Sequence, residues 1–202
     1  MKLIILASVI IACSLLANVI KKHTKKSEKS RDDFWGKELA ANNVRKKSLD
    51  DLNYVTIPTD RLPFHIMPEQ DKVQEYTSII QALSSRKIVN FTGITNTDLK
   101  LTYGTANITV LSEYDENYTT LITTLQKWAK LLYDNNYVEE TRTILEYAVS
   151  VGSDITATYY LLADIYRAEG NETKIFELID AASELPGKNG KTIAHTLRES
   201  YL

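Results

Sequence analysis

The chain has 202 residues, of which 44% are hydrophobic and 25% are charged, a composition typical of a folded globular protein. Its single cysteine excludes an internal disulfide, a four-cysteine zinc site and a cysteine-ligated iron–sulfur cluster. The three histidines, at positions 23, 65 and 195, show no metal-ligand spacing, so the sequence predicts no metal site and no cofactor.

The net charge of −2 conceals a strong asymmetry along the chain. Residues 21–47 carry ten basic and four acidic side chains, whereas the residues from 48 onward carry 13 basic and 22 acidic ones. Such asymmetry favours a surface partner for the basic end. The acidic remainder disfavours nucleic-acid binding, because attraction to phosphates requires clustered Lys and Arg.

The first residues predict a membrane anchor. Residues 3–20 contain no charged side chain, and this length falls within the roughly 17–25 residues that a spanning helix needs. KKHTKK follows at 21–26, and the positive-inside rule then places the rest of the chain on the cytoplasmic side. We therefore expect a single-pass transmembrane helix over residues 1–20, in a cell membrane of bacterial type.

Two alternatives remain open for this segment. A cleaved secretory signal normally has its basic residues before the apolar run, and here only Lys2 precedes it. Ile10 to Cys13 resembles a lipoprotein signal, and acylation of Cys13 would display the chain on the outer face. The apolar run continues after Cys13 to residue 20, which favours a spanning helix in which Cys13 is a small apolar side chain.

Residues 21–59 are expected to form a basic juxtamembrane stalk. Within it, Trp35, Leu39 and Val44 recur every four or five residues, which predicts an amphipathic helix over about 31–47. This helix either lies on anionic lipid or is a solvated spacer. On the first interpretation, the lipid-contacting residues are Lys21, Lys22, Lys25, Lys26 and Trp35.

Residues 60–112 are expected to hold one helix and an irregular connector. Pro68 suits the first position of a helix, and an apolar face with helical spacing then runs to about Ser85. The pattern in 88–112 is weaker. It suggests one short helical turn at 97–101, ended by Gly104, and a short strand at 107–111.

The 88–112 segment also carries an alternative hypothesis, in which the protein is a membrane-tethered enzyme or small-ligand-binding protein. Its polar candidates are Asn96, Asp98, Lys100 and Tyr103, close together before Gly104. We find no acid–base pair and no nucleophile motif among them, so the sequence assigns no catalytic residue and favours a protein that is not an enzyme.

Residues 113–202 have the clearest helical pattern. The periodicity predicts helices at about 115–134, 137–151, 156–169, 172–184 and 190–201, with short turns between them. Ala129, Ala148, Ala163 and Ala182 mark places where two helices cross closely. Large neighbours are expected to fill the spaces between the helices: Trp128, Leu132, Tyr147, Leu162 and Tyr166.

A shift of 34 residues superimposes two parts of this region. It pairs Trp128 with Leu162, Ala129 with Ala163, Leu132 with Tyr166, and Ala148 with Ala182. Together with LLADIYRAEGN at 161–171, these residues resemble the tetratricopeptide repeat, a helix–turn–helix of 34 residues. Ile175 departs from the motif, which has Ala there, and the first unit, 122–155, matches less closely than the second.

The resemblance covers about 70 residues and implies an all-α array of antiparallel helical hairpins, capped by flanking helices, that binds other proteins. We expect a scaffold or adaptor at the cytoplasmic membrane face. Residues 113–202 carry 15 acidic and eight basic side chains, so a basic segment of a partner protein is expected. The candidate partner-binding residues, on the first helix of each pair, are Tyr133, Asn136, Tyr159 and Arg167.

Two further patterns are weak. GKNGKT at 187–192 looks like a phosphate-binding loop, but it has two residues between its glycines where that motif has four, so a loop before the last helix is favoured. Asn90, Asn107, Asn117 and Asn171 each lie in an N-x-T sequence, which accepts a glycan only in a eukaryotic secretory lumen.

Overall fold

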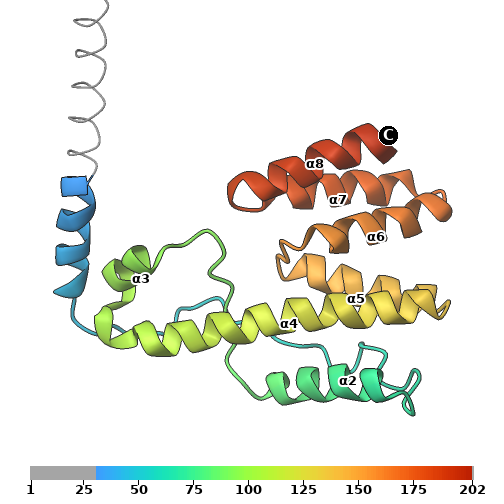
Figure 1. The fold of residues 1–202 in the computed structure, drawn as a ribbon, viewed down its shortest axis with the longest axis horizontal. Coiled ribbons are helices and arrows are strands. Elements are labelled where there is room, and N and C mark those ends of the chain that lie inside the picture. The colour runs from blue at the N-terminus through green and yellow to red at the C-terminus, as the bar shows by residue number, and fades with distance from the viewer. Residues whose placement is uncertain (1–30, 202) are drawn as a thin grey trace, which may run out of the picture. The chain divides into compact units, whose positions relative to one another are not determined.

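The computed structural model describes residues 31–201, and its fold is all-helical (Figure 1). Residues 31–42 are helical, and the later elements are α2 (Asp71–Ser84), α3 (Asn96–Tyr103), the short 3-10 helix η1 (Thr105–Asn107), α4 (Ile108–Asp134), α5 (Val138–Ser150), α6 (Thr156–Ala168), α7 (Glu172–Glu184) and α8 (Gly187–Tyr201). The extended backbone contributes one isolated antiparallel bridge, between Tyr54 and Val89. The expected all-α class is confirmed for this part of the chain.

The expected anchor over residues 1–20 and the lysines at 21–26 lie outside the described residues. Between residues 31 and 201, none of the helices combines the length and the apolar character that crossing a bilayer requires.

The chain divides into two compact units. The first unit comprises the described residues up to Lys47 together with Thr95–Ile108, and the second comprises Ser48–Ile94 together with Thr109 onward.

The first unit is organised around the end of α3. The Thr95 side chain caps α3 by accepting a hydrogen bond from the Asp98 amide, and Gly104 ends it with a φ of 89°. Backbone at Lys47 pairs with Tyr103, where the Lys47 amide donates to the Tyr103 carbonyl at 3.0 Å. Asn107 Nδ2 donates to the Lys47 carbonyl at 2.8 Å. The short helical turn predicted at 97–101 is confirmed, since it lies within α3 and Gly104 ends that helix.

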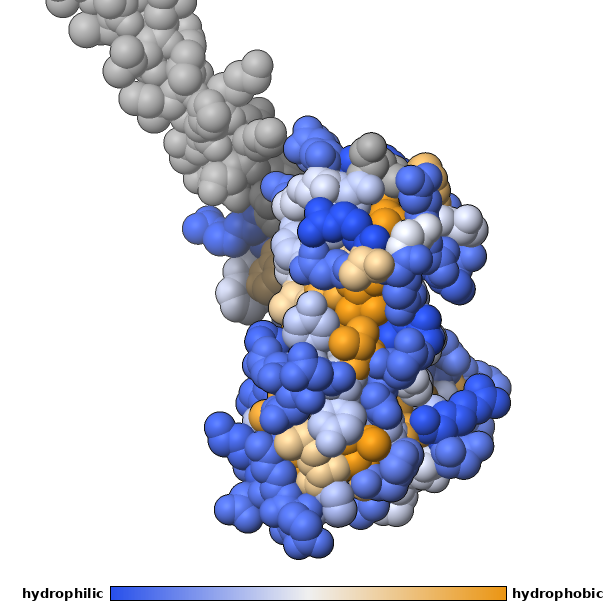
Figure 2. All heavy atoms as spheres, turned by 90° about the vertical axis from the view of Figure 1, so that its right-hand side faces the viewer, coloured by the Kyte–Doolittle hydropathy of each residue, from blue (hydrophilic) through white to orange (hydrophobic). Residues whose placement is uncertain are grey.

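The core of the second unit lies between stacked helices. The four alanines predicted at helix crossings, Ala129, Ala148, Ala163 and Ala182, are all fully buried, as are Trp128, Leu132 and Leu162. α6 packs against α5, α7 and α8, and Figure 1 shows these four helices stacked one on the next. On the face drawn in Figure 2, apolar side chains form a band bordered by hydrophilic ones.

The helices at 137–151, 156–169 and 172–184 are confirmed to within one residue at each end as α5, α6 and α7. α5 and α7 both have 13 residues, and they begin at Val138 and Glu172, the spacing that the 34-residue shift predicts. α8 begins at Gly187, three residues earlier than expected.

Two predicted boundaries are wrong. In place of the strand expected at 107–111, Asn107 ends η1 and Ile108 begins α4. Leu111 and Tyr118 lie seven residues apart on one face of α4 and are both buried. Pro68 is not the first residue of α2. Met67, with a φ of 51°, turns the chain before it, and α2 begins at Asp71.

Candidate partner-binding groove

Of the four candidate partner-binding residues, Tyr133 lies at the end of α4 and Asn136 in the turn after it, while Tyr159 and Arg167 are both on α6. Tyr159 needs a correction: it is fully buried on α6, so it belongs to the core and offers no surface to a partner. Tyr133 is half-buried against the same core. Asn136 is exposed in the turn after α4, where its φ of 66° lets the chain reverse.

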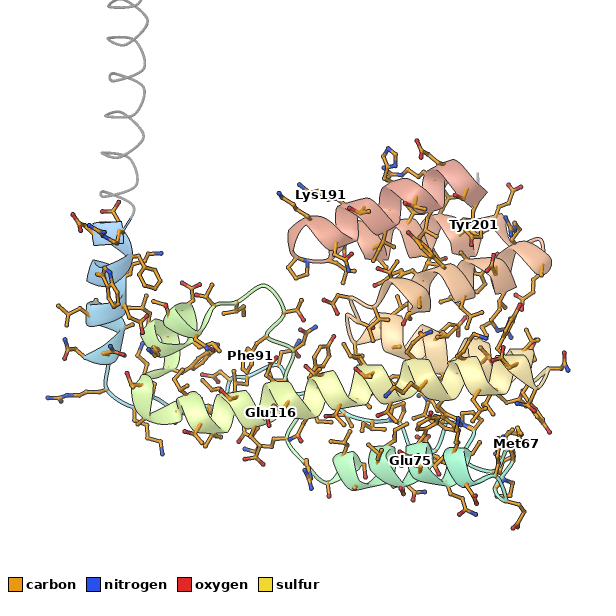
Figure 3. The ribbon with its side chains drawn as sticks, in the orientation of Figure 1. Met67, Glu75, Phe91, Glu116, Lys191 and Tyr201 are labelled. Carbon is orange, nitrogen blue, oxygen red and sulfur yellow. The ribbon has the colours of Figure 1, made fainter. Side chains whose placement is uncertain are left out.

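Arg167 is exposed, but its guanidinium is held by neighbouring side chains. It bonds Asp164 at 3.1 Å and lies over the ring of Tyr201, 4.6 Å from the ring centroid. Tyr201, at the end of α8 in Figure 3, donates its hydroxyl proton to Asp164 at 2.9 Å. These contacts connect α8 to α6, and Arg167 takes part in them.

A cleft opens instead across the second helices of the two hairpins. It has a volume of about 300 Å³ and is called here the α5–α7 cleft. Its floor is apolar, with Leu162 and the ring of Tyr166 from α6 and Leu178 from α7. The remaining lining residues are Glu146, Val149 and Ser150 from α5, and Lys174, Glu177 and Ala181 from α7.

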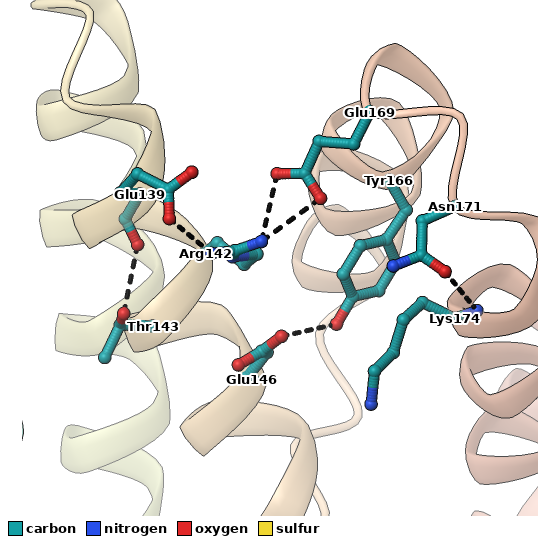
Figure 4. A network of polar contacts seen from close by, with 8 residues as sticks. All are labelled: Glu139, Arg142, Thr143, Glu146, Tyr166, Glu169, Asn171 and Lys174. Atoms are coloured by element: carbon teal, nitrogen blue, oxygen red, sulfur yellow. Dashed lines mark hydrogen bonds and ion pairs between the residues drawn. The ribbon is translucent and has the colours of Figure 1, made fainter.

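Three of the lining residues are charged, Glu146, Lys174 and Glu177, and Figure 4 shows the first two together with Tyr166. Tyr166 donates its hydroxyl proton to Glu146 at 2.8 Å, and Lys174 bonds Glu177 at 2.7 Å. Burial, followed by the bond to Glu146, raises the pKa of Tyr166, so the hydroxyl stays protonated and holds the Glu146 carboxylate in place. The bond to Glu177 raises the pKa of Lys174.

A second charged group, centred on Arg142, joins α5 to the turn after α6 and does not line the cleft. Arg142 on α5 donates from Nη1 to both carboxylate oxygens of Glu169 at 3.2 Å, and it also pairs with Glu139 (Figure 4). Because Glu169 directly follows α6, this ion pair connects α5 to the turn before α7.

The cleft continues past Ser150 into two more hollows. One, of about 270 Å³, is lined by Val149, Ser150 and Ala181 and extends to Glu184 and Pro186. The other, of about 430 Å³, is reached over Ser150 and Pro186 and is bounded by the extended residues 53–56. We call the three hollows together the groove. It lies entirely within the second unit, and the acidic side chains along it are Glu146, Glu177 and Glu184, against one basic side chain, Lys174.

Asn90 organises the polar end of the groove. Its Nδ2 donates to the Tyr118 hydroxyl at 2.9 Å and to the Val151 carbonyl at 3.3 Å, and its Oδ1 accepts from the Thr92 amide at 2.8 Å. These bonds tie the 90–92 loop to the end of α5.

The N-x-T asparagines have structural roles. Asn107 and Asn117 are buried, and Asn117 donates to the Lys87 carbonyl at 3.0 Å. Asn171 caps α7 by accepting from the Lys174 amide. In the folded chain, the side-chain amides of Asn90, Asn107 and Asn117 each donate hydrogen bonds.

The phosphate-loop-like residues at 187–192 form the first turns of α8, so the loop expected before the last helix is wrong for these residues. Gly190 is buried and packs closely against α7. A Cβ at this position would lie 2.4 Å from the Ala182 carbonyl oxygen. The glycine therefore serves close helix packing.

The polar candidates of the alternative hypothesis make contacts inside the first unit. Asp98 accepts a hydrogen bond from the Thr95 hydroxyl at 2.6 Å, and Lys100 pairs with Glu38. The Tyr103 carbonyl accepts from Asn107. Asn96 is exposed at the start of α3. Asp98 and Lys100 thus stabilise α3 and its contact with the 31–42 helix.

Sequence reasoning missed the groove because it assigned binding to the first helix of each pair. Two signals in the sequence point to the second helices. Glu146 follows the buried Leu145 on α5, and Lys174 precedes the buried Ile175 on α7. The small residues Ser150 and Ala181 leave space beside them. Neither feature predicts the distance between α5 and α7, and that distance determines whether a cleft exists between them.

Comparison of the chain with models of protein families, with curated proteins and with solved structures gave no match.

Proposed function

We propose that this protein is a membrane-anchored scaffold or adaptor whose groove across α5, α6 and α7 binds a segment of another protein. The α5–α7 cleft carries the proposal, because its apolar floor is open to solvent between two helices while its rim is charged. Peptide sites on helical arrays combine a hydrophobic recess for an anchor side chain with polar groups that orient the chain.

The stacking of α5 to α8 supports a tetratricopeptide-like array. α6 contacts the helix before it, the helix after it and α8, as expected when each hairpin packs on the next. Such arrays present extended surfaces, and the groove runs along one of them.

The charge of the groove indicates the partner's chemistry. Three carboxylates and one ammonium group line it, and the second unit as a whole carries 21 acidic and 12 basic side chains between residues 48–94 and 109–201. A segment with a large apolar side chain flanked by Lys or Arg matches both the floor and the rim.

The anchor is the second part of the proposal. The uncharged run at 3–20 and the basic residues after it support a single-pass helix with the body on the cytoplasmic side. The groove would then recruit its partner to the membrane.

A direct test measures peptide binding to the detergent-solubilised full chain by fluorescence anisotropy. The probes are two labelled peptides, one with leucine flanked by lysines and one with leucine flanked by glutamates. We expect the lysine peptide to bind at least about tenfold more tightly, which corresponds to about 1.4 kcal/mol. Its affinity should fall as salt is raised.

Ala181→Arg provides the site-specific variant, because it places a long cationic side chain in the cleft. We expect it to weaken the lysine peptide by about tenfold or more. Phe176→Ala is the matched control, since Phe176 is also on α7 and exposed but does not line the cleft. Equal affinity for the two peptides, or binding that Ala181→Arg leaves unchanged, would refute the groove as the site.

A further inference from the structure

Exposed apolar side chains concentrate on the helix at 31–42. Seven large hydrophobic residues are exposed between positions 31 and 201, and three of them lie on this short helix: Phe34 at 53% exposed, Trp35 at 62% and Leu39 at 68%. Such a concentration on a surface helix is unfavourable in water unless another surface covers it.

The geometry of the helix separates a packed face from an uncovered one. Ala41 is fully buried, and Glu38 pairs with Lys100 and accepts from the Thr97 hydroxyl, so these residues attach the helix to α3. Trp35 and Leu39 lie one turn apart on another face. The Phe34 ring packs edge-on against Trp35, with centroids 5.6 Å apart.

Charge favours an anionic surface as the cover. The first unit carries six basic and four acidic side chains among residues 31–47 and 95–108, and one of the acids, Glu38, is already paired with Lys100. The ten residues before it, 21–30, add five lysines and one glutamate. The second unit, in contrast, is strongly acidic and would be repelled by an anionic surface.

The position of the helix in the chain selects a lipid surface among anionic ones. Ten residues separate Ile20, the end of the uncharged run, from Arg31, and even a fully extended chain spans only about 40 Å between these two residues. A helix with exposed Trp and Leu and nearby cations, held this close to a bilayer, has the composition of an interfacial helix.

We propose that the helix at 31–42 binds the surface of anionic lipid bilayers through Phe34, Trp35 and Leu39, with Arg31 and Lys37 neutralised by lipid headgroups. This contact is separate from the groove, but it rests on the membrane anchor proposed above. Contact of this helix with lipid would orient the first unit on the bilayer, whereas the anchor alone would only tether the chain.

The two tryptophans make the proposal measurable. Trp128 is fully buried in the second unit and Trp35 is largely exposed, so only Trp35 reports a lipid contact. The full chain is incubated with zwitterionic vesicles or with vesicles that contain an anionic lipid, each with and without brominated acyl chains. Vesicle flotation is measured in parallel. Trp35→Phe supplies the background emission of Trp128.

With anionic vesicles we expect the Trp35 emission to shift to the blue and to lose more than about half of its intensity to brominated lipid, as for an interfacial tryptophan. Zwitterionic vesicles should give a smaller loss. Leu39→Ser should reduce the quenching, whereas Phe176→Ser, at a site that is 52% exposed on α7, should not.

The outcomes distinguish this proposal from the anchor. Flotation with quenched Trp35 supports both. Flotation with Trp35 unquenched and still accessible to aqueous iodide overturns the lipid-binding helix and leaves the anchor intact. A full chain that does not float with anionic vesicles overturns both. Quenching that is equal in the two lipids overturns the role given to the basic residues.

Discussion

Tyr118 and Tyr159 are both fully buried tyrosines of the second unit, but their hydroxyl groups differ. The Tyr118 hydroxyl donates to the Val151 carbonyl at 3.2 Å and accepts from Asn90. The Tyr159 hydroxyl finds no partner among residues 31–201. Tyr118→Phe should therefore lower the free energy of unfolding by about 1–2 kcal/mol, whereas Tyr159→Phe should leave it unchanged or raise it by up to about 1 kcal/mol.

Urea unfolding of the two variants, followed by circular dichroism, compares these hydroxyl groups directly. Both substitutions keep the aromatic ring, so the packing terms cancel in the comparison. Equal losses in the two variants would mean that the hydrogen bonds of Tyr118 contribute nothing net to stability.

Gly104 ends α3 and packs closely against the backbone of Arg45 in the first unit. Its φ of 89° disfavours any side chain, and a Cβ there would lie 2.3 Å from the Arg45 carbonyl oxygen. Gly104→Ala should destabilise the first unit by more than about 2 kcal/mol and speed amide hydrogen exchange in residues 43–47 and α3.

Gly36→Ala is the matched control for this change, because a Cβ at Gly36 meets no atom within 4 Å and the residue is within the 31–42 helix. It should stabilise that helix by about 0.5–1 kcal/mol and slow its exchange. Exchange in α3 that is the same in Gly104→Ala as in the unsubstituted chain would contradict the role of Gly104.

At the scale of elements, the contact between α7 and α8 depends on one small residue. A Cβ at Gly190 would lie 2.4 Å from the Ala182 carbonyl oxygen and 2.6 Å from the Leu185 Cβ. Gly190→Ala must therefore move α8 away from α7, and we expect it to lower the free energy of unfolding by about 1–3 kcal/mol.

Lys191→Ala tests whether such a loss is specific to the packed position. Lys191 is exposed on α8, one residue away from Gly190 (Figure 3), and its truncation should change stability by less than about 0.5 kcal/mol. Thermal unfolding of the two variants under identical conditions gives the comparison. A loss of the same size in both would indicate a sensitivity of α8 to any substitution.

Helices that carry a long apolar stripe were the ones predictable from sequence. α5, α6 and α7 matched because buried residues recur within each of them at helical spacing, as Ile144, Leu145 and Ala148 do on α5, and because short turns separate the helices. The start of α4 did not, because Ile108, Thr109 and Val110 are β-branched and their local preference favours a strand. Burial of Leu111 on the continued helix outweighs that preference.

The groove was less predictable than the helices that form it. Tyr159 and Tyr166 are seven residues apart on α6 and look alike in sequence, yet Tyr159 is enclosed in the core while the Tyr166 hydroxyl reaches Glu146 at the cleft rim. Periodicity places both on the inner face. Which of them borders a hollow depends on the separation of α5 and α7, which is a tertiary property.

At the scale of the whole molecule, five of its 12 tyrosines couple folding to alkaline pH. Burial raises the pKa of Tyr147 and Tyr159 to about 12, and burial together with a bond to Asp164 does the same for Tyr201. Tyr118 and Tyr166 are raised as well, mainly by burial. In the unfolded chain each of these groups ionises near a pKa of about 10.

The folded state therefore holds these protons more tightly than the unfolded state does. Below a pH of about 10 both states are protonated, and this contribution to stability is constant. Above it the unfolded chain ionises first, so the free energy of unfolding should fall as pH rises from about 10 to about 12. Urea unfolding across this range, with tyrosinate absorbance recorded on the folded protein, measures both quantities. Tyr159→Phe should make the fall shallower, because it removes one of the coupled groups. The contradicting outcome is a folded protein that keeps its helices while all its tyrosines titrate near a pH of about 10. Burial would then not protect these hydroxyl groups from ionisation.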